Sequence, residues 1–180
     1  MTEINDKGLI TRQLMTYGAI IGIITTVYSL ILFSSGINEF TPSPDAPFIA
    51  GLRPIIVGLG IYYSVRHLAT KILKIRLKFG KFLLYGILIG LFFSIIDASY
   101  YVIFLKYISP STLDKILETS SELYKSWNIP YDAEMAKNIM SKPFVLFMVQ
   151  LFGSTFQATV YSLIFAVLYT FTSKLTQKKD

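Results

Sequence analysis

The sequence predicts an all-α integral membrane protein: a four-helix transmembrane bundle with an extracytoplasmic amphipathic helical segment between spans three and four. Two observations predict this fold. Hydrophobic residues make up 53% of the 180-residue chain and charged residues only 16%, whereas a soluble domain carries roughly 25% charged residues. The apolar residues are also gathered into four long runs, and the mean hydropathy is +0.54. These values argue against a soluble domain.

The four apolar runs match the length of a transmembrane helix. A bilayer core about 30 Å thick requires roughly 20 mostly apolar residues in helical form. The predicted spans are 15–33, 48–65, 82–107 and 144–171. Each is expected to be helical because the hydrocarbon holds no water to satisfy exposed backbone groups. The second span is the shortest and contains Arg53 and Pro54, so its outer boundary is the least sharply defined.

The charges between the spans predict the orientation of the chain. The loop 66–81 carries six basic residues and no acid, whereas the loop 37–49 carries Glu39 and Asp45 and no basic residue. By the positive-inside rule, the first loop is cytoplasmic and the second is extracytoplasmic. Both termini are also expected in the cytoplasm, since basic residues flank the first and last spans: Lys7, Arg12, Lys174, Lys178 and Lys179.

The predicted organisation follows from these spans. It consists of a cytoplasmic N-terminal tail (1–14), spans one to three with the basic cytoplasmic loop (15–107, with the loop at 66–81), an extracytoplasmic helical segment (108–143), span four (144–173) and a cytoplasmic C-terminal tail (174–180). A cleaved signal peptide ending near Ser34 is the alternative interpretation of the first span. The apolar stretch there is about 19 residues long, beyond the usual 7 to 15 of a signal peptide, so we predict an uncleaved span.

The segment between spans three and four is expected to form two amphipathic helices. Ser109 and Pro110 provide a cap and a first-turn proline, and apolar residues then recur at intervals of three and four as far as Trp127. Pro130 ends this helix, and a second short helix starts near Asp132. We predict a lid on the outer membrane surface or over the mouth of the bundle, with Trp127 at the interface. A packed connector is favoured over a ligand-binding lid.

Small residues recur along the spans at the spacing that lets helices approach closely. In lipid, apolar area alone does not drive helices together, so such positions contribute much of the packing. We predict helix packing at six of them: Gly18, Gly22, Gly86, Gly90, Ser94 and Gly153. The hexapeptides at 17–22 and 85–90, YGAIIG and YGILIG, also align without a gap. They indicate either a duplicated helical hairpin or a chance match between two apolar segments.

Asp97 lies well inside the third span, where an acid costs about 2.5 to 3.5 kcal/mol on insertion scales. At 1.5 Å per residue it falls roughly 12 Å below the outer surface, close in depth to polar residues of the other spans. The candidate intramembrane polar cluster consists of one residue from each span: Arg53, Asp97, Gln150 and Tyr28.

Three interpretations of this cluster remain open. The favoured one is a buried Arg53–Asp97 pair that fixes helix register, with Gln150 and Tyr28 satisfying the remaining donors and acceptors. The second is a proton or ion relay. The third is an unpaired, protonated Asp97.

Several short motifs follow one another along the chain. They are Tyr17-Gly18, Tyr28-Ser29-Leu30-Ile31-Leu32, Lys78-Phe79-Gly80, Tyr107-Ile108-Ser109-Pro110, Asp114-Lys115-Ile116-Leu117-Glu118 and Leu151-Phe152-Gly153-Ser154. In this order and spacing the chain resembles a bacterial family of short four-helix integral membrane proteins, the domain of unknown function 4199. The aspartate usual before the proline is Ser109 here. The resemblance implies a multi-pass protein of the bacterial cytoplasmic (inner) membrane, and it brings no known activity or catalytic residues.

Composition and motifs also limit the possible functions. The chain has no cysteine and one histidine, His67, which excludes disulfide, iron–sulfur and cysteine-nucleophile chemistry and most zinc sites. It contains no phosphate-binding glycine-rich loop, HExxH or GxSxG motif. We therefore expect no enzyme activity, no cofactor and no metal. Nucleic-acid binding is not expected either, because topology accounts for the basic loop, which is suited to contact anionic lipid headgroups.

Two hypotheses from different classes follow. The first is a small structural or accessory membrane protein that packs with itself, as a homo-oligomer, or with a larger membrane complex. The second is a small transporter or channel subunit with a polar path around Asp97. Four spans are few for a monomeric carrier, so the second hypothesis requires an oligomer.

Overall fold

The computed structural model describes the backbone of residues 3–40 and 48–176 and the side chains of residues 8–40, 48–49 and 51–172. Within these residues the chain is all-α and contains no strand. The helices are α1 (Glu3–Ser34), α2 (Leu52–His67), α3 (Phe79–Ile103), α4 (Ser111–Ser126), α5 (Ala133–Met140) and α6 (Pro143–Thr176). The charges predicted at Asp45, Lys178 and Lys179, and the side chains of Lys7 and Lys174, lie outside the described residues.

Three short helical segments extend these elements. A 3₁₀ turn (Phe48–Gly51) leads directly into α2, and π-helical turns continue α2 through Leu68–Ile72 and α3 through Phe104–Ile108. The helical path around α2 therefore runs without a break from Phe48 to Ile72.

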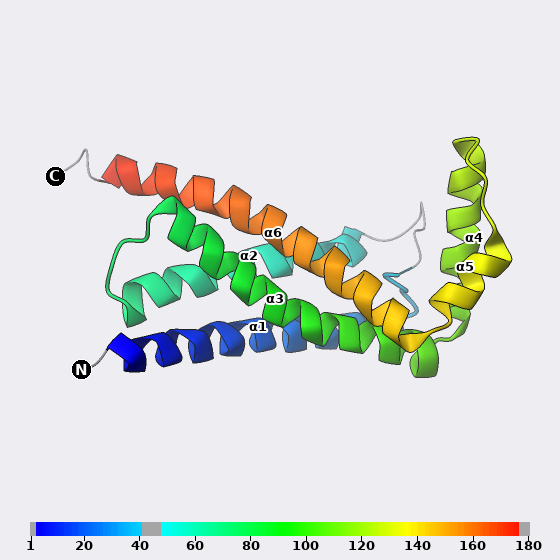
Figure 1. Ribbon diagram of the computed structural model, residues 1–180, viewed down its shortest axis with the longest axis horizontal. Coiled ribbons are helices and arrows are strands. Elements are labelled where there is room, and N and C mark those ends of the chain that lie inside the picture. Colours follow the sequence, from blue (N-terminus) through cyan, green and yellow to red (C-terminus); the bar gives the residue numbers. More distant parts are fainter. Residues whose placement is uncertain (1–2, 41–47, 177–180) are drawn as a thin grey trace.

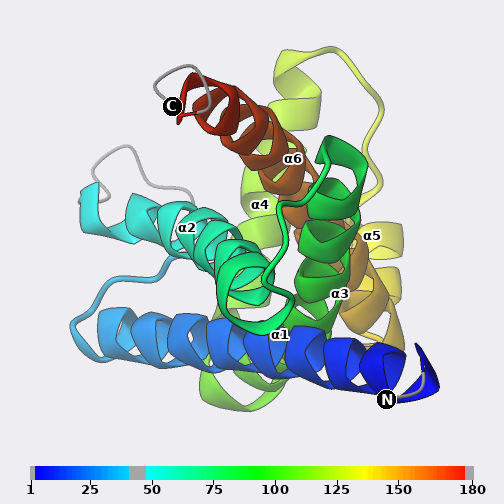
Figure 2. The same ribbon diagram turned by 90° about the vertical axis from the view of Figure 1, so that its left-hand side faces the viewer.

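Four of the helices form an elongated bundle. Helices α1 and α3 run in one direction and α2 and α6 in the other, so that both termini and the connection between α2 and α3 lie at one end (Figure 1). We call this the terminal end and the opposite end the arm end. Seen from the terminal end, α3 lies between α1 and α6 (Figure 2), and these two helices are its most extensive neighbours.

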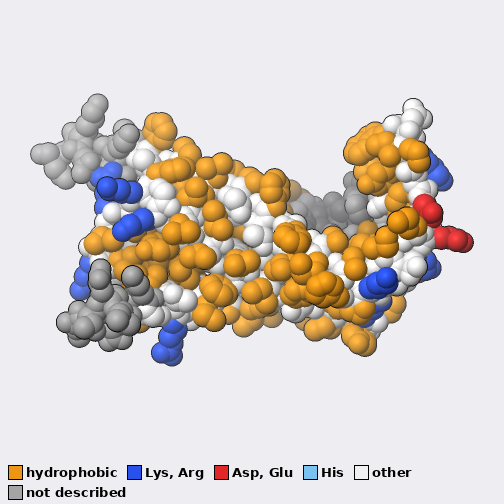
Figure 3. All heavy atoms as spheres, in the orientation of Figure 1, with side chains coloured by type: hydrophobic (Ala, Val, Ile, Leu, Met, Phe, Trp, Pro, Cys, Tyr) orange, Lys and Arg blue, Asp and Glu red, His pale blue; other side chains and the backbone are white. Residues whose placement is uncertain are grey.

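Three helical stretches of the described chain are long and apolar enough to cross a membrane: Gly8–Ser34, Phe79–Ile108 and Pro143–Thr172. Their outward faces carry large exposed hydrophobic side chains, which cover most of the bundle surface in Figure 3. The second predicted span, 48–65, corresponds to α2, which has only 16 residues. The described residues therefore contain three such helices where the sequence predicts four.

Close helix approach at glycine explains how α3 packs on both neighbours. A Cβ atom added at Gly18 of α1 would lie 2.5 Å from the Cβ of Phe92, and one added at Gly90 would lie 2.4 Å from the Cβ of Ala158 on α6. Gly22 and Gly86 are nearly as tight, with an added Cβ 2.8 Å from the Cβ of Ile96 and 2.6 Å from the Oγ of Ser162. Larger residues at these positions would push the helices apart.

The prediction that Gly153 packs against another helix is wrong within the described chain. Gly153 is exposed, and a Cβ atom added there would meet nothing within 4 Å. The buried face of α6 instead passes through Ser154, Ala158 and Ser162. Because each residue turns a helix by about 100°, Gly153 lies off the face on which its neighbour Ser154 is buried. Ser94, also predicted to pack, is buried and donates to the Gly90 carbonyl at 2.7 Å.

The segment between α3 and α6 forms the two predicted helices, and we call residues 111–140 the arm. The carboxylate of Asp132 caps α5 by accepting from the Met135 N–H at 2.9 Å. Lys137 donates to Asp114 at 2.8 Å and so links α5 to α4. The arm stands crosswise at the arm end of the bundle (Figure 1), and in the view along the bundle α4 lies behind the bundle helices (Figure 2). Only Thr112 and Leu113 of α4 are buried, and no residue of α5 is.

Candidate functional site

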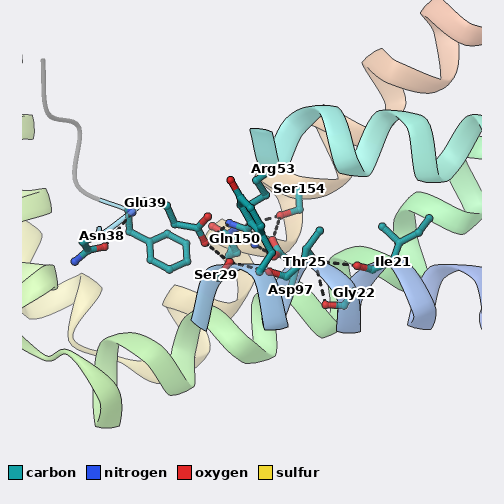
Figure 4. A network of polar contacts seen from close by, with 12 residues as sticks. Ile21, Gly22, Thr25, Ser29, Asn38, Glu39, Arg53, Asp97, Gln150 and Ser154 are labelled. Carbon is teal, nitrogen blue, oxygen red and sulfur yellow. Dashed lines mark hydrogen bonds and ion pairs between the residues drawn. The ribbon is translucent and has the colours of Figure 1, made fainter. Parts of the chain in front are cut away.

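The site is built around Asp97, which α3 places in the interior of the bundle. Its side chain is 2% exposed. One carboxylate oxygen, Oδ1, is paired with Nη2 of Arg53. The other, Oδ2, accepts from Nε2 of Gln150 at 2.7 Å and from the Ser154 hydroxyl. Groups from α2, α3 and α6 therefore converge on one carboxylate (Figure 4).

Arg53 belongs to the first turn of α2, where Pro54 is tolerated because its missing N–H has no acceptor within the helix. Its second guanidinium nitrogen, Nη1, lies 3.2 Å from Oε1 of Glu39. The guanidinium carbon is also 5.5 Å from the centre of the Phe40 ring, within the range of a cation–π contact. The arginine is thus shared between two carboxylates and one aromatic face.

Glu39 reaches this site from the connection between α1 and α2. Its Oε1 accepts from the hydroxyl of Ser29 on α1, and that hydroxyl also bonds the Thr25 carbonyl at 2.9 Å. The Glu39 side chain is only 6% exposed. Burial raises the pKa of its carboxyl group, and the smaller effects of Arg53 and Ser29 oppose that rise. The second oxygen, Oε2, has no hydrogen-bond partner among the described residues.

These residues line a cavity of about 210 Å³. Its walls are formed by Glu39, Gly51, Arg53, Pro54, Phe93, Asp97, Gln150 and Gln157. We call Glu39, Arg53, Asp97, Gln150 and Ser154 the charge cluster. It contains one basic and two acidic side chains, all at least four-fifths buried.

Three of the four residues predicted for the polar cluster lie together: Arg53, Asp97 and Gln150. Tyr28 does not join them, because its hydroxyl donates to the backbone carbonyl of Ile49. Depth along a helix predicts height but not direction around the axis, and the neighbouring Ser29 is the α1 residue that faces the cluster.

Glu39 and Ser154 also belong to the charge cluster, but the prediction from depth in the membrane did not include them. From the sequence, Glu39 was interpreted only as an acidic residue that places the loop 37–49 on the extracytoplasmic side. An acid followed at once by an aromatic residue, Phe40, was the available signal.

The core differs on the two sides of the cluster. Toward the terminal end it consists of apolar side chains, including Val57, Ile61 and Phe82, which are 0–1% exposed. Three buried hydroxyls in this region, those of Thr25, Ser94 and Ser162, donate back to carbonyls of their own helices. Toward the arm end, the aromatic group comprises Phe33, Phe40, Tyr100, Tyr101 and Phe104. Beyond Gln157, which lines the cavity and donates to the Tyr161 hydroxyl at 3.1 Å, the described core toward the terminal end is mostly apolar.

The comparisons with known proteins address the whole chain and not this site alone. No curated protein and no solved structure matches it. Residues 16–170 match the family described as "Protein of unknown function (DUF4199)". The match extends from α1 into the last turns of α6 and so includes the charge cluster and the arm. Because it covers most of the sequence, the chain belongs to the DUF4199 family.

Proposed function

We propose that the protein is a four-span, multi-pass protein of the bacterial cytoplasmic membrane, with both termini on the cytoplasmic side. The continuous helical path from Phe48 to Ile72 supports a fourth span, since it is roughly 35 Å long at about 1.5 Å per residue. The clustering of bases at the terminal end supports the orientation (Figure 3). These bases are Arg12, Arg66, Lys71, Lys74, Arg76, Lys78 and Lys81. They are suited to contact anionic lipid headgroups.

The same proposal places the arm flat on the extracytoplasmic surface of the membrane. A helix that stands crosswise to a membrane-spanning bundle is parallel to the membrane plane, and α4 does so (Figure 1). Figure 3 supports this arrangement, because the apolar side chains of the arm face the side of the bundle and its charged side chains face away. The exposed apolar residues are Leu123, Tyr124, Trp127, Ile129, Met135 and Ile139. Such a helix settles into the boundary between headgroups and acyl chains.

Trp127 provides a direct test of this placement, because it is the only tryptophan in the chain. The full protein is reconstituted into vesicles whose lipids carry bromine near the glycerol end of the acyl chain. We expect blue-shifted Trp127 emission that these lipids quench, and weaker quenching by lipids brominated near the chain end. Emission typical of water, with no quenching by either lipid, would contradict the placement.

For the molecular role, we propose a non-catalytic structural or accessory protein that packs with itself or with a larger membrane complex. The observation that supports it best is the core between the charge cluster and the terminal end, which is mostly apolar and whose buried hydroxyls donate to carbonyls of their own helices. The exposed faces of the bundle, including the open position at Gly153 on α6, offer room for a further helix.

Native mass measurement after extraction in mild detergent tests this role. We expect a stable oligomer or a complex of fixed stoichiometry. A parallel flux assay in vesicles should give the same sodium, potassium and proton leak with and without the protein. A monomer without partners would contradict the accessory role.

A transporter or channel subunit is the second candidate, and the cavity of about 210 Å³ beside Asp97 favours it. In an oligomer, a partner helix would have to continue the polar path from the cavity toward the terminal end. Ion flux in vesicles that disappears in Asp97→Asn would support this candidate over the accessory role. Flux that is unchanged in the same variant would place the path elsewhere.

A further inference from the structure

The charge cluster is short of one positive charge. Two carboxylates, Glu39 and Asp97, face a single guanidinium, that of Arg53. Both acidic side chains are more than nine-tenths buried, so water does not screen them well. With both acids ionised the cluster has a net charge of about −1, and charges buried to this extent are normally balanced by a partner.

The two carboxylates differ in how well they are satisfied. Both oxygens of Asp97 have partners, in Arg53, Gln150 and Ser154. Of the two oxygens of Glu39, Oε1 bonds Ser29 and Arg53, whereas Oε2 has no partner among the described residues. Buried polar atoms are nearly always bonded, so this oxygen points to a missing ligand.

The cavity next to Glu39 also supplies neutral oxygen ligands. Gln150 uses its amide N–H groups on Asp97 and on Ser154, at 2.7 and 3.1 Å. Gln157 donates to the Tyr161 hydroxyl at 3.1 Å. With their nitrogens engaged in this way, both glutamines have an amide oxygen to offer to the cavity that they line. Carboxylate and amide oxygens are ligands that hard cations prefer.

We propose that this cavity binds one alkali-metal cation, sodium or potassium, against Oε2 of Glu39. A single positive charge completes the charge balance of the cluster, whereas a divalent ion would leave it positive. The space of about 210 Å³ accommodates such an ion with several waters, each of which occupies about 30 Å³ in the liquid. The inference goes beyond the accessory role proposed above, because the ion is bound by one chain and needs no partner.

The experiment measures thermal unfolding of the full chain in detergent at constant ionic strength, with choline replaced stepwise by sodium or by potassium. A ligand that binds only the folded protein raises its unfolding temperature in a saturable way. We expect such a rise for sodium or potassium. Calorimetric titration should give one ion per chain. No saturable rise with either ion would overturn the proposal.

Two variants locate the ion. Glu39→Gln keeps the size of the side chain and removes its charge, so we expect the affinity for the cation to fall by about tenfold or more. Glu134→Gln removes an exposed acid on α5 and serves as the matched control with unchanged affinity. Gln157→Met removes a neutral ligand without breaking an ion pair and should weaken binding by a smaller factor.

Each outcome has a definite meaning for the proposal. Cation binding that persists in Glu39→Gln would overturn it by placing the ion elsewhere. Should Glu39→Gln fail to fold, unchanged binding in Gln157→Met would overturn it instead. Stabilisation at low pH that is equal in choline, sodium and potassium would show that a proton occupies the site. This result would also overturn the proposal. A monomeric protein that binds the cation would contradict the accessory role but support the ion site.

Discussion

The two halves of the bundle are held together by different means. In the half toward the terminal end, α3 meets its neighbours through glycine contacts such as Gly18 and Gly90 and through apolar side chains. In the half toward the arm, the same helix meets α2 and α6 through Asp97, Arg53 and Gln150. The first kind of contact selects helices by shape and the second by charge. The second leaves the polar cavity that Asp97 and Gln150 line.

The largest expected effect on stability comes from removing Arg53, whose guanidinium pairs with both acids in the arm half. Arg53→Ala removes the guanidinium that pairs with both buried carboxylates, which we expect to destabilise the fold by about 3–5 kcal/mol. Arg66→Ala, at the exposed terminal end, removes the same charge and should change stability by no more than about 0.5 kcal/mol. Denaturation in detergent and the amount of protein in the membrane measure both. Equal stability of the two variants would show that the charges in the arm half are not structural.

A substitution at Gly90 tests the close packing of α3 against α6 in the terminal half. In Gly90→Leu, the new side chain collides with Ala158, so we expect a loss of about 1–3 kcal/mol from overpacking. Gly153→Leu introduces the same side chain where nothing lies within 4 Å and should be nearly neutral for the monomer. The unfolding midpoints of the two variants measure the difference. A neutral Gly90→Leu would mean that α3 and α6 are not in close contact there.

Acid should affect the arm half through Glu39. Its pKa in the folded protein is raised above the ordinary value of 4.5, mainly by burial. A raised pKa means that the contribution of Glu39 to stability is fully present below pH 4.5 and is lost as pH rises through the folded-state pKa. In choline buffer, wild type should therefore lose stability relative to Glu39→Gln as pH rises through this window. Parallel curves for the two proteins would contradict this sign.

The smallest effect on stability is expected in the arm. Leu123→Asp places a charge on the apolar face of α4, outside the bundle core. We expect the unfolding midpoint to stay within the equivalent of about 0.5 kcal/mol. In vesicles with the arm facing outward, however, trypsin should cleave faster after Lys125, because the arm no longer lies on the lipid. Leu123→Met, the control, should be cleaved at the wild-type rate.

The same contrast explains which features the sequence could predict. Length and hydropathy sufficed for the long helices α1, α3 and α6, because one long apolar run is all that such a helix requires. The positions of Arg53, Asp97 and Gln150 followed from depth, since rise per residue is nearly constant. Direction around a helix is less well determined, and for that reason Tyr28 was placed in the polar cluster and Gly153 at a helix contact, neither of which the described chain shows.

No periodic sequence pattern could predict that Glu39 belongs to the site. It lies on the connection between α1 and α2, and only the tertiary fold turns that connection back toward Ser29 and Arg53. The unsatisfied oxygen belongs to this residue, which also lines the cavity. The most informative part of the site is therefore the part that no helical spacing describes.

A double-mutant cycle on Arg53 and Asp97 tests most directly whether charge holds the arm half together. The unfolding free energies of Arg53→Ala, Asp97→Asn and the double variant are measured in detergent against the wild type. Paired residues should be coupled, so we predict that the double variant loses less stability than the sum of the two single variants, by about 1 kcal/mol or more. Losses that add within about 0.5 kcal/mol would contradict the account.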